Sequence, residues 1–189
     1  MIKLLSYRIA HWLERHNAIS CEEEPLYRYA AFNVLYAAIP ILIMLVIGMV
    51  LHVISGTILF IATFVALRKY SGGFHVQSFR TCLCFSILVE FIFIHLASYI
   101  DYAIILIPLI MISSVSLIRF SPIQSASRPL SIDDIVFCKR RIKIILVFLL
   151  FFCYLLCITD LESFAAYPVS ATAMVAVFQY PALIHHRWR

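Results

Sequence analysis

The residues of this chain best suited to chemistry lie in one short segment, 68–84, which reads RKYSGGFHVQSFRTCLC. It holds a glycine pair, a single histidine (His75) and two cysteines (Cys82 and Cys84). A cysteine attacks a carbonyl as its thiolate, and a nearby histidine can accept the thiol proton and later return it to a leaving amine. Segment 68–84 could therefore support cysteine-dependent acyl transfer, with His75 as the base.

The spacing between His75 and Cys82 constrains how the two side chains can meet. In one continuous helix they would be separated by roughly 10.5 Å along the axis, whereas a hydrogen-bonded pair needs about 3 Å. The chain must therefore bend between them, and Ser78 is suited to cap a helix that begins at Phe79. Cys82 would then lie in the first turn of that helix, where unpaired backbone N–H groups stabilise a thiolate and an oxyanion.

Three features of the segment have more than one interpretation. Cys82 and Cys84 would point about 200° apart on a helix, so only one of them can face His75. Gly72 and Gly73 would let the backbone turn and approach a substrate closely, or they form only a flexible turn between spans. No second Cys or His pair is placed to complete four metal ligands, so neither a metal site nor a cofactor is expected.

The composition of the whole chain indicates a membrane protein. Of its 189 residues, 63% are hydrophobic and 13% are charged, which excludes a water-soluble core. Lys and Arg are costly at the bilayer centre, so the three intervals that lack them mark the membrane-embedded chain. Each interval is about twice as long as the roughly 20 residues of one spanning helix. This predicts three helical hairpins, over 29–67, 81–118 and 144–186.

The charges also predict how the six spans are oriented. The hairpin turns should lie near residues 52–57, 98–102 and 159–163, where the charged side chains are acidic. All Lys and Arg residues lie toward the opposite ends of the spans, so the positive-inside rule places both termini and segment 68–84 on the cytoplasmic side. The predicted fold is an all-α integral membrane protein with six transmembrane helices in three hairpins.

The first 20 residues predict an amphipathic helix that precedes the spans. Ile2, Leu5, Ile9 and Trp12 share an apolar stripe, while the arginines lie on another side. A helix of this kind lies in the membrane interface. We therefore expect two parts, an interfacial helix over 1–20 and a six-helix domain over 21–189.

The segment 119–143 is the only long polar stretch, and we expect it to be a cytoplasmic loop. It carries six basic residues, among them the run Lys139, Arg140 and Arg141. These charges can be explained by positive-inside topology together with attraction to anionic lipid head groups. Alternatively, they form a docking surface for an acidic peptide.

Segment 68–84 resembles the accessory gene regulator B (AgrB) proteins of Gram-positive bacteria. The likeness is in the spacing R-x-x-x-G-G-x-H-x-x-x-x-x-x-C, carried by Arg68, Gly72, Gly73, His75 and Cys82. It extends to the chain's length, its amphipathic start, its six spans and a loop reading S-P-x-x-x-x-x-R-P-L before a basic run. The family's loop often opens with Ala-Pro, where this chain has Ser121 and Pro122.

The resemblance implies a cysteine endopeptidase of the bacterial cell membrane, with its active site on the cytoplasmic side. Such an enzyme cleaves a quorum-sensing propeptide near its C-terminal end and helps to cyclise the product to a thiolactone or lactone. The resemblance selects Cys82 over Cys84 as the nucleophile and implies His75 as its base. The implied supporting or substrate-binding residues are Arg68, Gly72, Gly73, Lys139, Arg140 and Arg141.

The resemblance also implies partners, and other classes of protein compete with it. The partners are an AgrD-like propeptide and the lipid bilayer, with no nucleic acid, and the chain could form a homodimer. The competing classes are a small transporter and a non-catalytic scaffold. A transporter should show paired broken helices or repeated midplane charges, and Glu90 is the only such charge.

Glu90 is a functional candidate or a protonated or hydrogen-bonded structural residue. Groups that could orient His75 are Gln77, Asp133 and Asp134.

Overall fold

A computed structural model describes residues 2–72, 79–99, 103–123, 130–159 and 161–180 of the chain, with the backbone alone for 79–84 and 103. The described residues form helices and no strand, which confirms the all-α prediction. The seven helices are α1 (Ile2–Arg15), α2 (Glu24–Val50), α3 (Ile54–Ser71), α4 (Phe79–Ala97), α5 (Ala103–Phe120), α6 (Ile132–Ile158) and α7 (Glu162–Val177).

Several of these helices are apolar enough to lie in a membrane. The helices α2 and α6 have 27 residues each and mean hydropathies of 2.4 and 2.5, so each is long and apolar enough to cross a bilayer. Two shorter apolar stretches lie within α4 and α5, at Phe85–Ala97 and Ile104–Phe120. The prediction of six spans with both termini in the cytoplasm remains a prediction.

The chain divides into two compact units, Met1–Ile43 and Met44–Arg189. In the first unit, α1 buries Ser6 and Ala10 and leaves Leu5, Ile9 and Trp12 exposed, so its apolar stripe is available to a lipid surface. The predicted division of the chain at residue 20 remains a prediction.

The connection between α1 and α2 is held by a local hydrogen-bonded turn. The backbone N–H and the hydroxyl of Ser20 both donate to Glu23 Oε2, each at 2.9 Å. These two bonds favour the charged carboxylate and lower the pKa of Glu23. They close the turn just before α2 begins.

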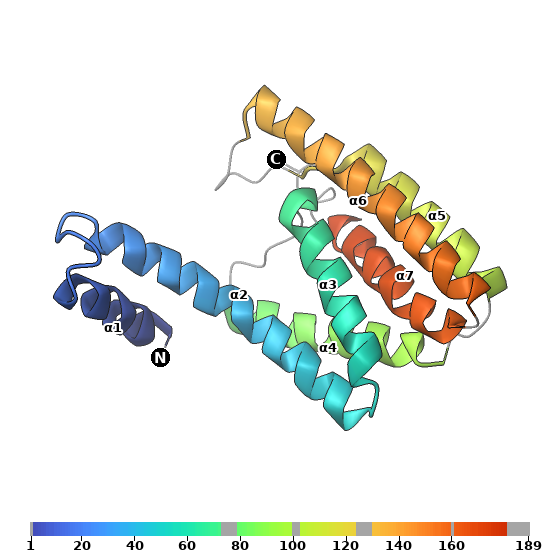
Figure 1. Cartoon of the computed structure of the whole chain (residues 1–189), viewed down its shortest axis with the longest axis horizontal. Coiled ribbons are helices and arrows are strands. Elements are labelled where there is room, and N and C mark those ends of the chain that lie inside the picture. Colours follow the sequence, from blue (N-terminus) through green and yellow to red (C-terminus); the bar gives the residue numbers. More distant parts are fainter. Residues whose placement is uncertain (1, 73–78, 100–102, 124–129, 160, 181–189) are drawn as a thin grey trace. The chain divides into compact units, whose positions relative to one another are not determined.

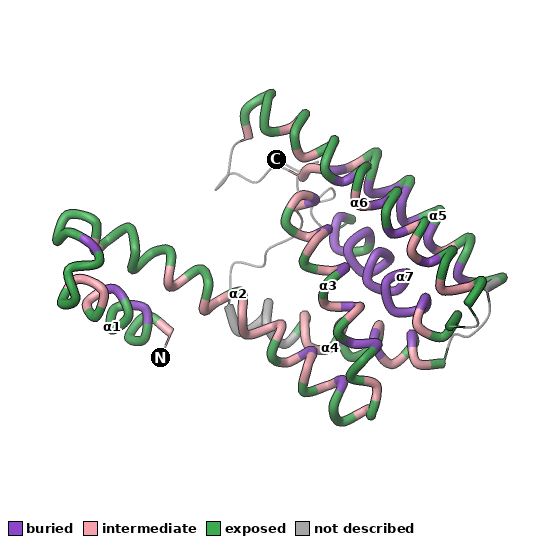
Figure 2. Tube along the Cα trace, viewed as in Figure 1, coloured by how far each residue is buried: buried purple, intermediate pink, exposed green. Residues whose placement is uncertain are grey.

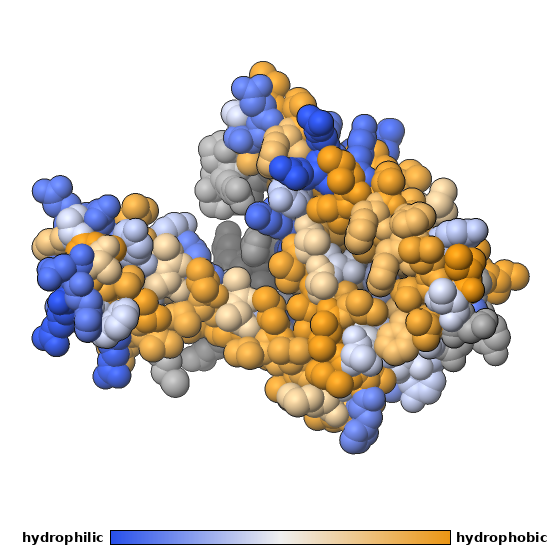
Figure 3. All heavy atoms as spheres, in the orientation of Figure 1, coloured by the Kyte–Doolittle hydropathy of each residue, from blue (hydrophilic) through white to orange (hydrophobic). Residues whose placement is uncertain are grey.

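In the second unit, α7 is the central helix. It packs against α3, α4, α5 and α6, and every residue from Ala165 to Ala176 is buried (Figures 1 and 2). Many of its side chains are small, so the neighbouring helices can approach closely. At Gly56 of α3, a Cβ atom would lie 2.2 Å from the ring of Tyr167. The apolar surface of the surrounding helices is seen in Figure 3, with hydrophilic residues gathered near the start of α6.

The polar segment 119–143 is not a loop throughout, as the sequence led us to expect. It is helical from Ile132 onward because Ser131 and Asp134 form a capping box. The backbone N–H of Asp134 donates to Ser131 Oγ at 3.1 Å, and the N–H of Ser131 donates to Asp134 Oδ2 at 3.2 Å. The basic run Lys139–Arg141 therefore lies on the first turns of α6, on a rigid support.

Candidate active site

The described residues end at Gly72 and resume at Phe79, so they flank residues 73–78, which hold His75 and form the catalytic segment. His75, Gly73 and the proposed cap Ser78 lie outside the described residues, and so does Gln77. The described part of α4 runs from Phe79, so the backbone of Cys82 lies close to its described N-terminal end. The predicted helix start after Ser78 remains a prediction. The pairing of His75 with Cys82 remains a prediction, and the described elements around it show what could position it.

Gly72 is the last described residue before the catalytic segment, and its conformation requires glycine. Its backbone has φ 67° and ψ −153°, a region that residues with a side chain rarely occupy. A Cβ atom at this position would lie 2.5 Å from the carbonyl oxygen of Ile123. The backbone segments around Gly72 and Ile123 approach this closely because the N–H of Ile123 donates to the carbonyl of Ser71 at 3.0 Å. Gly72 therefore turns the chain at the end of α3.

Arg68 holds the carbonyl group of Gly72 in place. Its Nη1 donates to that oxygen at 2.6 Å, and the hydroxyl of Ser71 donates to the same oxygen at 3.2 Å. The guanidinium carbon of Arg68 lies 5.5 Å from the ring centre of Phe178, at the end of α7. Arg68, predicted from the sequence to support the site, thus contacts the residue at which the chain enters the catalytic segment.

Arg68→Met should lower propeptide processing at least about 10-fold, because the charged hydrogen bond to Gly72 is lost. Arg68→Lys should recover only part of the activity, since an ammonium lacks the planar fork that bonds Gly72 and stacks on Phe178. Lys69→Met removes the same charge from the neighbouring exposed position and is the matched control. The measurement is kcat/KM in proteoliposomes, and equal losses at both positions would show that only charge matters.

The basic run on α6 lies at the same end of the second unit as Arg68. Lys139, Arg140 and Arg141 are exposed, and the guanidinium carbon of Arg141 lies 5.0 Å from the ring centre of Phe137. The ring of Phe137 contacts that of Tyr70, in the last turn of α3, at a centroid distance of 6.3 Å. The tertiary structure therefore brings together two groups of predicted site residues that are far apart in the sequence.

Two residues at the end of α7 belong to this region and were not predicted. The ring of Phe178 lies 6.0 Å from that of Phe85, one turn after Cys82 on α4. Gln179 is fully buried, and its Nε2 donates to Ser121 Oγ at 2.5 Å. A single amide at the end of an apolar run is the one sequence signal that could have drawn attention to Gln179.

The other ionisable candidates have distinct settings. Glu90 is buried on α4, and its Oε2 has no hydrogen-bond partner among the described residues. Asp134 takes part in the cap of α6, while Asp133 is exposed. The exposed Cys21 forms a hydrogen bond with Glu14, which raises the pKa of its thiol and keeps it from being an activated nucleophile at neutral pH.

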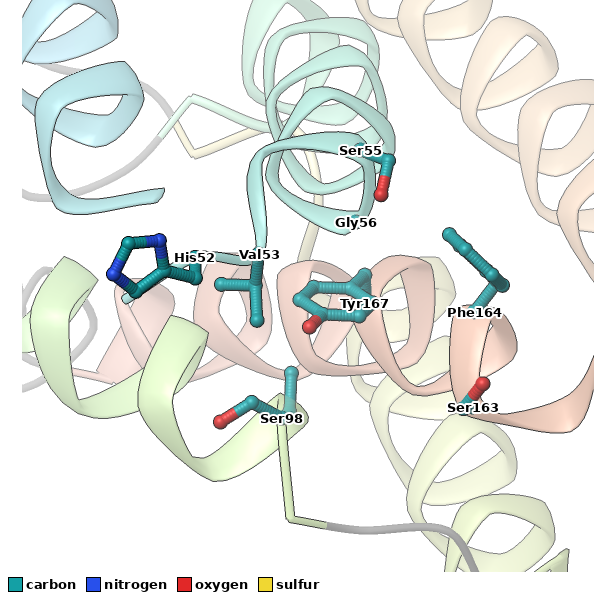
Figure 4. A pocket seen from close by; sticks show the side chains of 9 residues that line it. His52, Val53, Ser55, Gly56, Ser98, Ser163, Phe164 and Tyr167 are labelled. Atoms are coloured by element: carbon teal, nitrogen blue, oxygen red, sulfur yellow. The ribbon is translucent and has the colours of Figure 1, made fainter. Parts of the chain in front are cut away.

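The second unit contains a pocket of about 170 Å³ (Figure 4). It is formed at the turn between α2 and α3, the end of α4 and the start of α7. Its polar lining comes from His52, Ser55, Ser98, Ser163 and Tyr167. None of the predicted site residues lines it, and it begins at the opposite end of α3 from Arg68.

Apolar helices with a basic, hydrogen-bonded region at one end are typical of a helical membrane protein. Residues 6–180 match the family model described as "AgrB: Accessory gene regulator B", and the chain belongs to this family. The resemblance to AgrB proteins that was noted from the sequence is thereby confirmed. Membership implies a role in processing the quorum-sensing peptide of the accessory gene regulator system.

Two relatives from Clostridium perfringens are similar to this chain. "Putative AgrB-like protein 2" of strain 13 is 23% identical over 151 residues, covering 76% of this chain and 69% of the relative. "Putative AgrB-like protein" of strain SM101 is 24% identical over 149 residues, covering 75% and 66%. No solved structure matches the chain.

Proposed function

We propose that this protein is a membrane cysteine endopeptidase that cleaves an AgrD-like propeptide and promotes cyclisation of the product. The observation that carries the proposal is the position of Cys82 close to the described N-terminal end of α4, shortly after the segment that holds His75. If α4 starts after Ser78, as the sequence predicts, Cys82 lies in its first turn. Backbone N–H groups in a first helical turn have no partner within the helix. Such donors favour a thiolate and can bind the oxyanion of an acyl-transfer intermediate.

In the proposed reaction, His75 accepts the proton of the Cys82 thiol, and the thiolate attacks the scissile carbonyl. The tetrahedral oxyanion collapses as the C–N bond breaks, and the His75 imidazolium returns its proton to the leaving amine. A thioester between Cys82 and the N-terminal part of the substrate remains. A cysteine thiol within that part then attacks the thioester, forming a cyclic thiolactone and regenerating the Cys82 thiol. The exchange of one thioester for another is nearly isoenergetic, so it proceeds if water is kept away.

The proposed site faces the cytoplasm at the surface of a bacterial cell membrane, where an amphipathic propeptide would lie. Lys139, Arg140 and Arg141 are exposed on α6 just after Phe137, which contacts Tyr70 near the end of α3, and they form a cationic region there. An acidic segment of the propeptide would be attracted to this region. The proposed reaction uses only groups of this chain and of the substrate. It is also compatible with a homodimer.

The test of the proposed function is detection of the acyl-enzyme. The chain is reconstituted in vesicles with an AgrD-like propeptide, quenched in acid and examined by mass spectrometry. We expect an adduct on the peptide that contains Cys82, with the mass of the N-terminal substrate fragment, and its release by hydroxylamine because thioesters are cleaved by it. Processing without any adduct on this peptide, under conditions that trap a thioester, would contradict the proposal.

Replacing Lys139, Arg140 and Arg141 together by alanine should raise KM about 3- to 30-fold with little change in kcat, because three exposed charges each contribute up to about 1 kcal/mol. Raising the salt concentration should increase KM for the unchanged chain more than for the variant. The assay is run in vesicles of neutral lipid and of anionic lipid. A KM effect confined to anionic vesicles would assign these charges to lipid binding instead of peptide binding.

A further inference from the structure

Gln179 is the buried polar group whose role the proposed reaction leaves unexplained. It lies just beyond α7 and is 0% exposed. Its Nε2 donates to the hydroxyl of Ser121, which is itself buried, whereas its Oε1 has no hydrogen-bond partner among the described residues. A buried amide with one unpaired oxygen is less stable than an apolar side chain of similar size, so packing alone does not account for it.

The bond between Gln179 and Ser121 connects α7 to the entrance of the catalytic segment. Ser121 follows α5 directly, and Ile123 comes two residues later. The N–H of Ile123 donates to the carbonyl of Ser71 at 3.0 Å, and its own carbonyl oxygen is the atom that a Cβ at Gly72 would meet. Ser121 is therefore connected to Gly72 through Pro122 and Ile123, so a shift of Ser121 would also displace Gly72.

The neighbouring residue connects α7 to the other end of the same segment. The ring of Phe178 contacts Phe85 of α4 at 6.0 Å, and the guanidinium carbon of Arg68 lies 5.5 Å from its centre. Phe178, which follows α7 directly, thus contacts both the helix that ends before segment 73–78 and the helix that follows it. The end of α7 is placed to set the separation of these two helices.

We propose that Gln179 is a positioning residue, which anchors the turn at Gly72 through Ser121 and so sets the approach of His75 to Cys82. This inference rests on the proposed function. A base and nucleophile must come within about 3 Å of each other, and a displacement of about 1 Å can cost roughly 100-fold in rate. A link from the central helix is well suited to this task, since α7 is packed by four other helices.

The test uses the full chain in vesicles with an AgrD-like propeptide. Gln179→Leu should lower kcat about 10- to 100-fold per folded molecule while KM stays within about 2-fold, because the substrate-binding charges are untouched. Folded protein is counted from the monodisperse peak in detergent. Thr172→Val is the matched control, since Thr172 is equally buried on α7 but its hydroxyl donates only to Pro168 of the same helix, at 2.8 Å. Thr172→Val should have the same kcat as the unchanged chain.

A second pair of variants keeps the test decisive if Gln179→Leu does not fold. Ser121→Ala removes the acceptor of the Gln179 amide and should lower kcat in the same way, whereas Ser121→Thr retains a hydroxyl and should restore most of it. An unchanged kcat in Gln179→Leu, or in Ser121→Ala where the first variant is lost, would overturn the positioning role. The proposed function fails by a different result, namely normal processing by Cys82→Ala.

Discussion

Cys82→Ala should abolish cleavage of the propeptide, with kcat/KM lowered by at least about 10³-fold, because the proposed nucleophile is removed. His75→Ala should cause a loss of similar size, and the double variant should be no worse than either single one. Residues that act as one catalytic unit show this non-additivity. The assay is cleavage of propeptide by vesicles containing equal amounts of folded variant.

Cys84→Ala is the matched control for the nucleophile. It removes a thiol two residues away on the same helix, and it should keep at least about half of the activity because positions two apart on a helix differ by about 200° in direction. Cys82→Ser then asks whether a weaker nucleophile of nearly the same size can act at this position. Loss of processing in Cys84→Ala alone would move the nucleophile to Cys84, and full processing by both alanine variants would end the peptidase hypothesis.

Gly72→Ala is the second change with a large expected effect. The backbone conformation of Gly72 costs a residue with a Cβ atom about 1 to 3 kcal/mol, and the new methyl group would also lie 2.5 Å from the Ile123 carbonyl. To relieve both, the chain must move at the entrance to the catalytic segment. We expect kcat to fall about 100-fold and the protein to unfold at lower temperature, measured by propeptide cleavage and by thermal unfolding in detergent.

Gly48→Ala separates these two effects. A Cβ at Gly48 of α2 would also meet its neighbour, 2.4 Å from Thr57 Oγ1, but this contact lies near the turn between α2 and α3. It should destabilise the fold to a comparable degree and leave kcat per folded molecule within about 3-fold. Equal losses of kcat in the two variants would show that Gly72 matters only for stability.

Local features of the fold could be predicted from the sequence because they depend on local chemistry. The breaks between α2 and α3, between α4 and α5, and between α6 and α7 lie at or near the predicted turns. Hydropathy changes where a chain leaves an apolar environment, so such breaks can be read from the sequence. The helix of α4 was also expected from the sequence, and it is present from the first described residue, Phe79. The start of α6 was missed, although its capping box is a local signal, because the basic residues that follow were interpreted as loop.

His75 and Cys82 could be named from residue type, and Arg68 from the family resemblance; family membership supports these choices without testing them. What only the tertiary structure decided is how the site is held. In the sequence α7 is only one of several apolar stretches, and only packing makes it the central helix that contacts four others. The contacts of Gly72 with Ile123 and of Gln179 with Ser121 join positions about 50 residues apart or more. Hydropathy cannot specify such pairs, because equally apolar helices are distinguished by the shapes of their side chains and by a few buried hydrogen bonds.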